Sequence, residues 1–430
     1  MSREGSERLE GRYAPGLLPR QDLMLLGNVR DFVEREIIPV RKELEAGTRG
    51  GFREYEEMLA AMVPLGLYGC SLPEEYGGGG MTSALTLAAL AEELGRGDAS
   101  LGMAVLSGCL ALRPAVRADN REVLEAFSSL FCGGDPFTGA LALYEEEGCG
   151  DLEDSEAYWR LLATRARGEE GGWVLDGRKD RVTNAGRAGV FCVACREEGA
   201  GGEEAIALVY TGCPAPGLRL AGERQMAGLR GARYGDIELK GLKADGGFRA
   251  AGPGRDAELL RECLALARLL ACALAVGTAQ GALEEALDFT RERPAAGKPI
   301  RQHGVCAALL ADAASVVQAA RDCYAAAAAR FDRGGEEAGG ESRGMLSRAS
   351  LAYVFCCRAA VDVTNRCMEL MGSYGYVSDY HIEKYWRDAK ALQLSAGGAQ
   401  AARLDAARGL YPLESFCRNE LYEEMQRRRG

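Results

Sequence analysis

Histidine is almost absent from this sequence of 430 residues, which contains only His303 and His381. A zinc site has little support for that reason, because such sites need several histidine or cysteine ligands at short, defined spacings. The one Cys-x-x-Cys pair, Cys192 and Cys195, falls in a segment with the pattern of a strand. Residues three apart on a strand point to opposite faces, so the two thiols would diverge. We therefore expect no metal site.

The sequence also lacks a long apolar run and an excess of basic residues. No apolar stretch approaches the ~18 residues that indicate a membrane span. The polar first residues, MSREGSERLEGRYAPG, lack the apolar core of a secretion signal. A formal net charge of -11 argues against nucleic acid as a partner. The sequence therefore predicts a cytoplasmic protein without a membrane span.

Cysteine, in contrast, is abundant, with 15 residues. The cysteines are scattered, and several lie inside apolar helical segments, among them Cys109, Cys263, Cys272, Cys356 and Cys367. In a reducing compartment such thiols behave as small buried hydrophobic residues. The pattern indicates structural thiols, with a redox or metal role as the weaker alternative.

The apolar pattern divides the chain into three parts. Residues 1–135 show helical periodicity, interrupted by the glycine run Gly77–Gly80. Residues 136–250 carry short alternating runs between turns, which predict an antiparallel β-barrel or sandwich. Residues 251–430 return to long, apolar-striped helices and predict a four-helix bundle, with a flexible loop at 333–343. The expected fold is α+β, with domains of helices, sheet and bundle in that order.

The most distinctive pattern lies between Val361 and Arg408. A helix ends at the sequence GSYGY (residues 372–376), a charged helix carries EKYWRDAK (residues 383–390), and the chain breaks again at Gly397-Gly398. Glycine turns between helices present backbone amides to a ligand. Together these motifs resemble the C-terminal signature of the acyl-CoA dehydrogenase family.

Two earlier motifs agree with this resemblance. The sequence PEEYGG at residues 73–78, followed by a helix with EEL at 92–94, is similar to the family's N-terminal domain. The sequences WVLDG at 173–177 and VTNAG at 182–186 are similar to its middle barrel, relative to which residues 153–162 are inserted. The resemblance implies an FAD-dependent enzyme that desaturates the α,β bond of an acyl-CoA thioester.

The base of that reaction is missing from both places where the resemblance implies it. Family members carry a glutamate either on the second glycine turn, here Ala396, or directly before an arginine of the first bundle helix, here Ala267 before Arg268. A methyl group cannot accept the α-proton, and the loss of a positioned base costs about 10²–10⁴-fold in rate. Three other acids are candidates for the base: Glu262, Glu369 and Asp405. The alternative for each is a place on a solvated helix face or in an ion pair.

The residues that the resemblance implies for FAD are only partly present. Those expected to bind it are Thr183, Asn184, Arg293, Gly297 and Gly372. Other family positions are replaced, and Glu369 places a carboxylate where it would repel the FAD diphosphate. Tyr144 would fill flavin space beside Thr183. We expect FAD to be bound weakly, shared with a partner subunit, or lost.

The resemblance further implies that Arg268 and Arg387 bind the acyl-CoA thioester, with ion pairs inside the bundle as the alternative. The partners it implies are copies of this chain or a homologous subunit in a tetramer, and electron-transfer flavoprotein as electron acceptor.

Four functions are compatible with these residues. The first is a catalytically degenerate subunit of a heteromeric acyl-CoA dehydrogenase, in which another chain supplies the base and shares the FAD site. The second is an active acyl-CoA dehydrogenase with a relocated base. The third is a flavin monooxygenase on the same scaffold. The fourth is a non-enzymatic acyl-CoA-binding or assembly protein.

Overall fold

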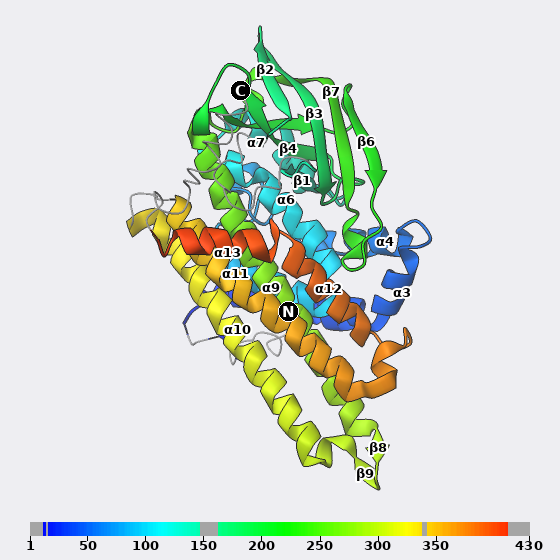
Figure 1. The fold of residues 1–430 in the computed structure, drawn as a ribbon. Coiled ribbons are helices and arrows are strands. Elements are labelled where there is room, and N and C mark those ends of the chain that lie inside the picture. Colours follow the sequence, from blue (N-terminus) through cyan, green and yellow to red (C-terminus); the bar gives the residue numbers. More distant parts are fainter. Residues whose placement is uncertain (1–11, 14–15, 147–161, 338–341, 412–430) are drawn as a thin grey trace, which may run out of the picture.

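The computed structural model of this chain describes residues 12–13, 16–146, 162–337 and 342–411. A β-sheet lies at one end of the molecule and a bundle of long helices extends away from it, with the N-terminal helices packed alongside (Figure 1). The predicted α+β architecture is confirmed. The predicted insertion at 153–162 falls outside the described residues except for Leu162.

Three of the N-terminal helices begin at side chains that cap them. Ser83 accepts a hydrogen bond from the backbone of Thr86, Asp98 caps the next helix, and Asn120 the one after. Pro39 lies in a 3-10 turn at Ile38–Val40, between the helical segments before and after it. The helices are α2 (Arg20–Phe32), α3 (Arg41–Gly47), α4 (Arg53–Ala61), α5 (Ala84–Gly97), α6 (Ala99–Ala118) and α7 (Arg121–Phe131).

The sheet contains seven strands in the order β1-β4-β2-β3-β7-β6, with β5 paired to β4. Most pairs are antiparallel as predicted, but β1 and β2 run parallel to β4. Cys192 and Cys195 on β4 point into two different cores, so their thiols diverge as expected. The strands are β1 (Gly139–Ala142), β2 (Arg165–Glu169), β3 (Gly172–Val182), β4 (Val190–Glu197), β5 (Ile206–Gly212), β6 (Leu218–Glu223) and β7 (Gly235–Asp245).

Tyr210 of β5 fastens the sheet to α6. Pro114 lies inside α6 and lacks a backbone N–H, which weakens the helical hydrogen bonding around it. The Tyr210 hydroxyl donates to the carbonyl of Ala111 at 2.9 Å and accepts from the amide of Ala115 at 3.1 Å. One side chain thus supports the helix at its proline and holds the two layers together.

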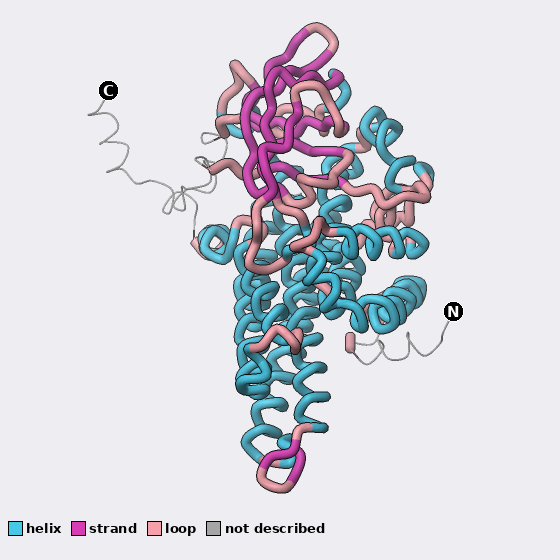
Figure 2. The backbone as a smooth tube through the Cα atoms, turned by 90° about the vertical axis from the view of Figure 1, so that its right-hand side faces the viewer, coloured by secondary structure: helices cyan, strands magenta, loops and turns pink. Residues whose placement is uncertain are grey.

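The bundle has three long helices and two short ones, α9 (Arg255–Glu292), α10 (Gly304–Glu337), α11 (Ser342–Met371), α12 (Ile382–Leu394) and α13 (Gly398–Arg408). The predicted break at Gly397-Gly398 is present, and it separates α12 from α13. The short hairpin of β8 (Pro294–Ala295) and β9 (Lys298–Pro299) closes the end of the bundle remote from the sheet (Figures 1 and 2).

The prediction of a flexible loop at 333–343 is wrong over most of its length. Helix α10 continues to Glu337 and α11 begins at Ser342, and the residues between them lie outside the described part. The composition of this segment misled the prediction, because arginine and glutamate are good helix formers and offset the cost of its glycines.

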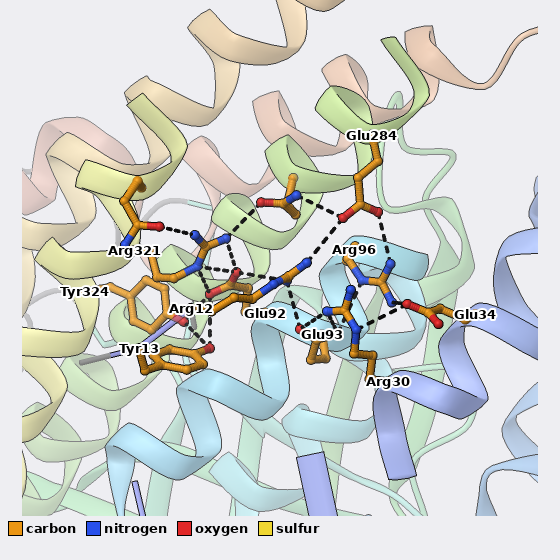
Figure 3. A network of polar contacts seen from close by, with 12 residues as sticks. Arg12, Tyr13, Arg30, Glu34, Glu92, Glu93, Arg96, Glu284, Arg321 and Tyr324 are labelled. Carbon is orange, nitrogen blue, oxygen red and sulfur yellow. Dashed lines mark hydrogen bonds and ion pairs between the residues drawn. The ribbon is translucent and has the colours of Figure 1, made fainter. Parts of the chain in front are cut away.

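A buried polar network joins the N-terminal helices to the bundle (Figure 3). Glu92 of α5 is fully buried and pairs with Arg321 of α10 at 2.7 Å. The neighbouring Glu93 accepts hydrogen bonds from Arg30 of α2 at 3.1 Å, and Arg96 pairs with Glu284 of α9 at 3.0 Å. The network therefore spans four helices from both parts of the chain.

Two helices among the described residues have the length and hydropathy of a membrane span: α6 and residues 304–334 of α10. In α6, 83% of the most apolar stretch is buried inside the protein, as is typical of a core helix. In residues 304–334 the share is 28%, and Val305 and Leu309 are exposed. The apolar face of α10 is therefore open on the single chain, and the absence of a membrane span stays a prediction.

Candidate functional site

The described residues enclose a cavity of about 1100 Å³ between the sheet, α6 and the bundle. Apolar side chains of α6, β1 and α9 make up much of its wall, and charged side chains stand among them at its edges. A cavity of this volume and character accommodates a large organic ligand. The apolar wall includes Met103, Leu106, Leu110, Leu141, Leu260, Leu264, Leu270 and Leu274.

The glycine turn between α12 and α13 faces this cavity. Ala396, Gly397 and Gly398 have φ angles of +49°, +89° and +78°. This left-handed conformation suits glycine, whereas it is uncommon for alanine. The Tyr353 hydroxyl lies 2.7 Å from the carbonyl oxygen of Ser395 and supports the start of the turn. Ala396 is thereby held in the cavity wall, and Ala267 of α9 lines the same cavity.

Arg268 is buried beside the turn, with 1% of its surface exposed. Its Nη1 lies 2.7 Å from a carboxylate oxygen of Asp405 and also contacts the Ser350 hydroxyl. Its Nε donates to the carbonyl of Ala396 at 3.3 Å. The guanidinium is therefore engaged with the protein on several sides. Arg268 also lines the cavity, so any contact with the substrate would be made from the cavity wall.

Of the three alternative acids, Asp405 lines the cavity. Glu262 pairs with Arg113 and Arg117, and Glu369 is exposed and bonded to Asn365. The structure thus brings one carboxylate close to the two alanines where the family base is missing. Sequence reasoning could not choose among the three.

Tyr144 lies beside the glycine turn and lines the same cavity as Thr183. A Cβ atom placed on Gly397 would lie 3.2 Å from the Tyr144 hydroxyl and 3.5 Å from Arg268 Nη2. Both side chains therefore lie close to the turn, and a side chain at position 397 would contact them.

Thr183 lies in the cavity wall, next to Tyr234. Burial raises the pKa of Tyr234 to about 12, although its hydrogen bond with Thr183 acts in the opposite direction. Thr183 is one residue from Asn184, but the two differ in surroundings. Asn184 is fully buried and donates to the carbonyl of Ala104 at 2.8 Å. Its amide ties α6 to the sheet and does not line the cavity.

The other residues predicted to bind FAD lie at the opposite end of the bundle (Figure 1). Arg293 follows α9, and its guanidinium carbon lies 4.7 Å from the ring centre of Tyr374. Gly297 belongs to the β8–β9 hairpin, and Gly372 begins the turn after α11 with a φ of +60°. Within one chain these three residues form a separate group from Thr183, and they do not line the cavity.

The charged residues of α12 form a buried network that the sequence did not reveal. Lys384 lies 3.0 Å from Asp98 at the start of α6 and also contacts Asp388. Burial alone would lower the pKa of Lys384, but these carboxylates raise it well above its usual value. Asp388 in turn accepts a hydrogen bond from the amide of Leu229 at 2.7 Å. The network holds the loop of residues 226–234 against α12.

Arg387 lies at the same edge of the cavity and is also engaged. Its guanidinium pairs with Glu383 and with Glu45, the latter at 3.0 Å, and donates to the carbonyl of Ala227 at 2.6 Å. Ion pairs inside the bundle were the alternative to substrate binding; the pair with Glu383 is of that kind, whereas Glu45 lies on α3, outside the bundle. In this structure Arg387 positions the cavity wall.

A second charged group stands at another edge of the cavity and was missed by the sequence analysis. Glu203, in the turn Gly202–Ala205 before β5, receives two hydrogen bonds from Arg261 of α9, at 2.9 and 3.1 Å. Arg343, at the start of α11, donates to the same carboxylate at 2.8 Å. All three residues line the cavity.

Comparison with known protein families gives a match along most of the chain. The acyl-CoA dehydrogenase N-terminal domain matches residues 19–126, the middle domain residues 142–242, and the C-terminal domain residues 257–411. The order of the three domains is the order in which the structure shows helices, sheet and bundle.

Individual proteins agree with this match. Cyclohex-1-ene-1-carbonyl-CoA dehydrogenase of Geobacter metallireducens is 30% identical, over 91% of this chain and 98% of that protein. The human mitochondrial short-chain specific acyl-CoA dehydrogenase is 28% identical, over 90% of this chain and 89% of that protein. The structure of butyryl-CoA dehydrogenase from Megasphaera elsdenii has a TM-score of 0.80 at 22% identity, covering 91% of this chain and 98% of that chain. At that identity the likeness concerns the fold.

Proposed function

Because this chain belongs to the acyl-CoA dehydrogenase family, we propose that it is a catalytically degenerate subunit of a heteromeric, FAD-dependent acyl-CoA dehydrogenase. One observation carries the proposal: the cavity is large and open, yet Ala267 and Ala396 present methyl groups where the family places its base. A chain of this kind binds an acyl-CoA thioester and relies on a homologous subunit for proton abstraction.

The part of the FAD-binding set that is present would hold FAD if two chains contribute to one site. Thr183 stands in the cavity of its own chain, whereas Arg293, Gly297 and Gly372 lie at the remote end of the bundle (Figure 1). In the proposed oligomer the Arg293 group completes the cofactor site of a neighbouring subunit, and its guanidinium suits a diphosphate. Bound FAD supplies the hydride acceptor, and electron-transfer flavoprotein is the proposed acceptor of its electrons.

The open apolar face of the bundle supports an oligomer. Val305 and Leu309 of α10 and Leu351 and Phe355 of α11 are 37–69% exposed on the single chain. Such exposed apolar surface is typical of a protein–protein interface. We propose that another subunit, a homologue or a copy of this chain, covers it.

A second candidate function is an active acyl-CoA dehydrogenase whose base is Asp405. It is favoured by the place of this carboxylate, which lines the cavity and lies 2.7 Å from Arg268. In that case Asp405 would take the α-proton and Arg268 would hold the carboxylate in place.

The test is to purify the chain alone and together with a homologous subunit that carries the family glutamate. Flavin absorbance per chain and ferricenium reduction by a panel of acyl-CoA thioesters are measured in both samples. We expect little flavin and no reduction for the chain alone, and both with the partner. One flavin per chain and ordinary turnover without a partner would contradict the proposal.

The variant Asp405→Asn separates the two candidates. If the chain alone is active and this change removes its activity while CoA binding persists, the relocated base is correct. Thioester binding without flavin in either sample would instead favour a non-enzymatic acyl-CoA-binding protein.

A further inference from the structure

The ion-paired group at the second edge of the cavity has two cations and one anion. Glu203 is 36% exposed at its side chain, Arg261 18% and Arg343 42%. The guanidinium of Arg261 donates to both carboxylate oxygens of Glu203. This bidentate arrangement is the strongest geometry for an arginine–carboxylate pair. The same geometry suits a phosphate oxygen pair equally well.

The arginines of this group are better placed for an anionic ligand than Arg387 at the other charged edge. Arg387 is already shared among Glu383, Glu45 and a backbone carbonyl, so a ligand there would have to break three contacts. Arg343 is 42% exposed at its side chain, against 16% for Arg387. Arg261 and Arg343 both pair with Glu203, which lies on a short turn before β5, and Arg261 also donates to the Ser342 hydroxyl at 2.9 Å. Removing the Glu203 side chain would take away the carboxylate that pairs with both cations at the cavity.

Burial alone would raise the pKa of Glu203, but Arg261 and Arg343 more than offset this and keep it below its usual value. The carboxylate is therefore charged at neutral pH, and it competes with any anion for the two arginines. A competing carboxylate of this kind weakens binding of an anionic headgroup and leaves a neutral one unaffected.

We propose that Arg261 and Arg343 form the binding site for the phosphate groups of a thioester headgroup, and that Glu203 occupies this site while the cavity is empty. This inference rests on the proposed function, in which the cavity receives a CoA thioester. It adds that the headgroup must displace Glu203, so that headgroup charge decides which thioesters the chain accepts.

The test compares binding of a charged and a neutral probe by titration calorimetry. The charged probe is butyryl-CoA, and the neutral probe is S-butyryl-N-acetylcysteamine, which has the same acyl group and no phosphate. In Glu203→Gln we expect butyryl-CoA to bind about 2- to 10-fold more tightly, the range expected when exposed ion pairs no longer compete. Binding of the neutral thioester stays unchanged.

The neighbouring Glu204 provides a matched control. It is exposed and does not line the cavity, so Glu204→Gln removes the same charge one residue away. It should change neither affinity. In Arg343→Gln we expect weaker binding of butyryl-CoA and a smaller gain from Glu203→Gln, because the two residues share one contact.

Three results would overturn the inference. Glu203→Gln could leave the affinity for butyryl-CoA unchanged or weaken it, or it could tighten both probes equally, which would indicate a steric effect. If neither probe nor CoA itself binds to the wild-type chain or to any variant, the proposed function fails together with the inference. Binding of butyryl-CoA without the expected response to Glu203→Gln contradicts the inference alone.

Discussion

At the scale of single residues, Asp405 is the counter-ion of Arg268, and 2.7 Å separate its carboxylate oxygen from Nη1 of the guanidinium. Asp405 is 7% exposed and Arg268 1% exposed, so neither charge is stabilised by bulk water. A buried arginine without a counter-ion costs several kcal/mol of stability. A carboxylate on α13 now neutralises that cation.

Asp405→Asn is therefore expected to destabilise the chain by about 3–5 kcal/mol, because it leaves Arg268 buried without its counter-ion. The measurement is the free energy of unfolding in urea. The double variant Arg268→Met/Asp405→Leu removes both charges and should recover most of the loss. Equal stability of the single variant and the wild type would show that the pair contributes nothing.

His381 gives the chain a sensitivity to acid. Burial, Lys384 and Arg41 lower the pKa of His381 to about 3, and its Nδ1 has no hydrogen-bond partner among the described residues. The unfolded chain takes up a proton near pH 6.5 that the folded chain refuses. The neutral imidazole therefore contributes stability above pH 6.5 that is lost as the pH falls toward 3.

Between pH 7 and pH 5 we expect this single group to reduce the free energy of unfolding by about 2 kcal/mol. The variant His381→Gln keeps a neutral side chain and should lose that much less over the same interval. Urea denaturation at both pH values checks the difference. Parallel pH profiles for the two proteins would disprove the role of His381.

At the scale of secondary-structure elements, α12 is the helix that positions the cavity wall. Its signature EKYWRDAK supplies Lys384, Arg387 and Asp388, and each of these binds a different segment of the chain. The loop of residues 226–234 packs so tightly on α12 that position 228 has no room for a side chain. The charged residues of the motif thus hold together the segments that surround the cavity.

Gly228→Ala tests this packing. A Cβ atom at position 228 would lie 2.2 Å from the carbonyl oxygen of Arg387, so the loop must move away from α12. We expect a loss of roughly 1–3 kcal/mol in stability, as for other overpacked sites, and weaker ligand binding in the cavity. Gly201→Ala is the matched control, because a Cβ atom there meets nothing within 4 Å. Similar unfolding midpoints for both variants would refute the close contact.

The sequence predicted those elements that local chemistry determines. The alternating residues of β4 predict a strand with Cys192 and Cys195 on opposite faces, as the structure has it. The site depends on pairs that are distant in the chain. Glu203 and Arg343 are 140 residues apart, and no periodic pattern links them. Such pairs become visible only when the fold brings them together.

At the scale of the whole molecule, the network of Glu92 and Glu93 joins two parts of the chain that the domain pattern separates (Figure 3). Burial alone would raise the pKa of Glu92, but Arg321 and Tyr324 offset this and keep it below its usual value. Glu92 therefore stays charged inside the protein. The N-terminal helices and the bundle should unfold as one unit.

Glu92→Gln is expected to cost about 3–5 kcal/mol, because Arg321 remains buried without its partner. Glu57→Gln removes an exposed pair with Arg53 and should leave the free energy of unfolding nearly unchanged. Denaturation followed by both tryptophan fluorescence and circular dichroism measures the effect. Two separate transitions in the wild-type protein would contradict the coupling of the two parts.

The distance between Thr183 and the Arg293 group has a further consequence for the proposed cofactor. A ligand that needs both ends of the chain can be held only by two molecules. The fraction of flavin that stays bound therefore depends on the association of two chains, and so on protein concentration. Dilution should then release flavin from the protein well before the protein unfolds. Adding back a subunit that carries only the Arg293 end should slow this release. The flavin absorbance of a sample would therefore measure how far its subunits are associated.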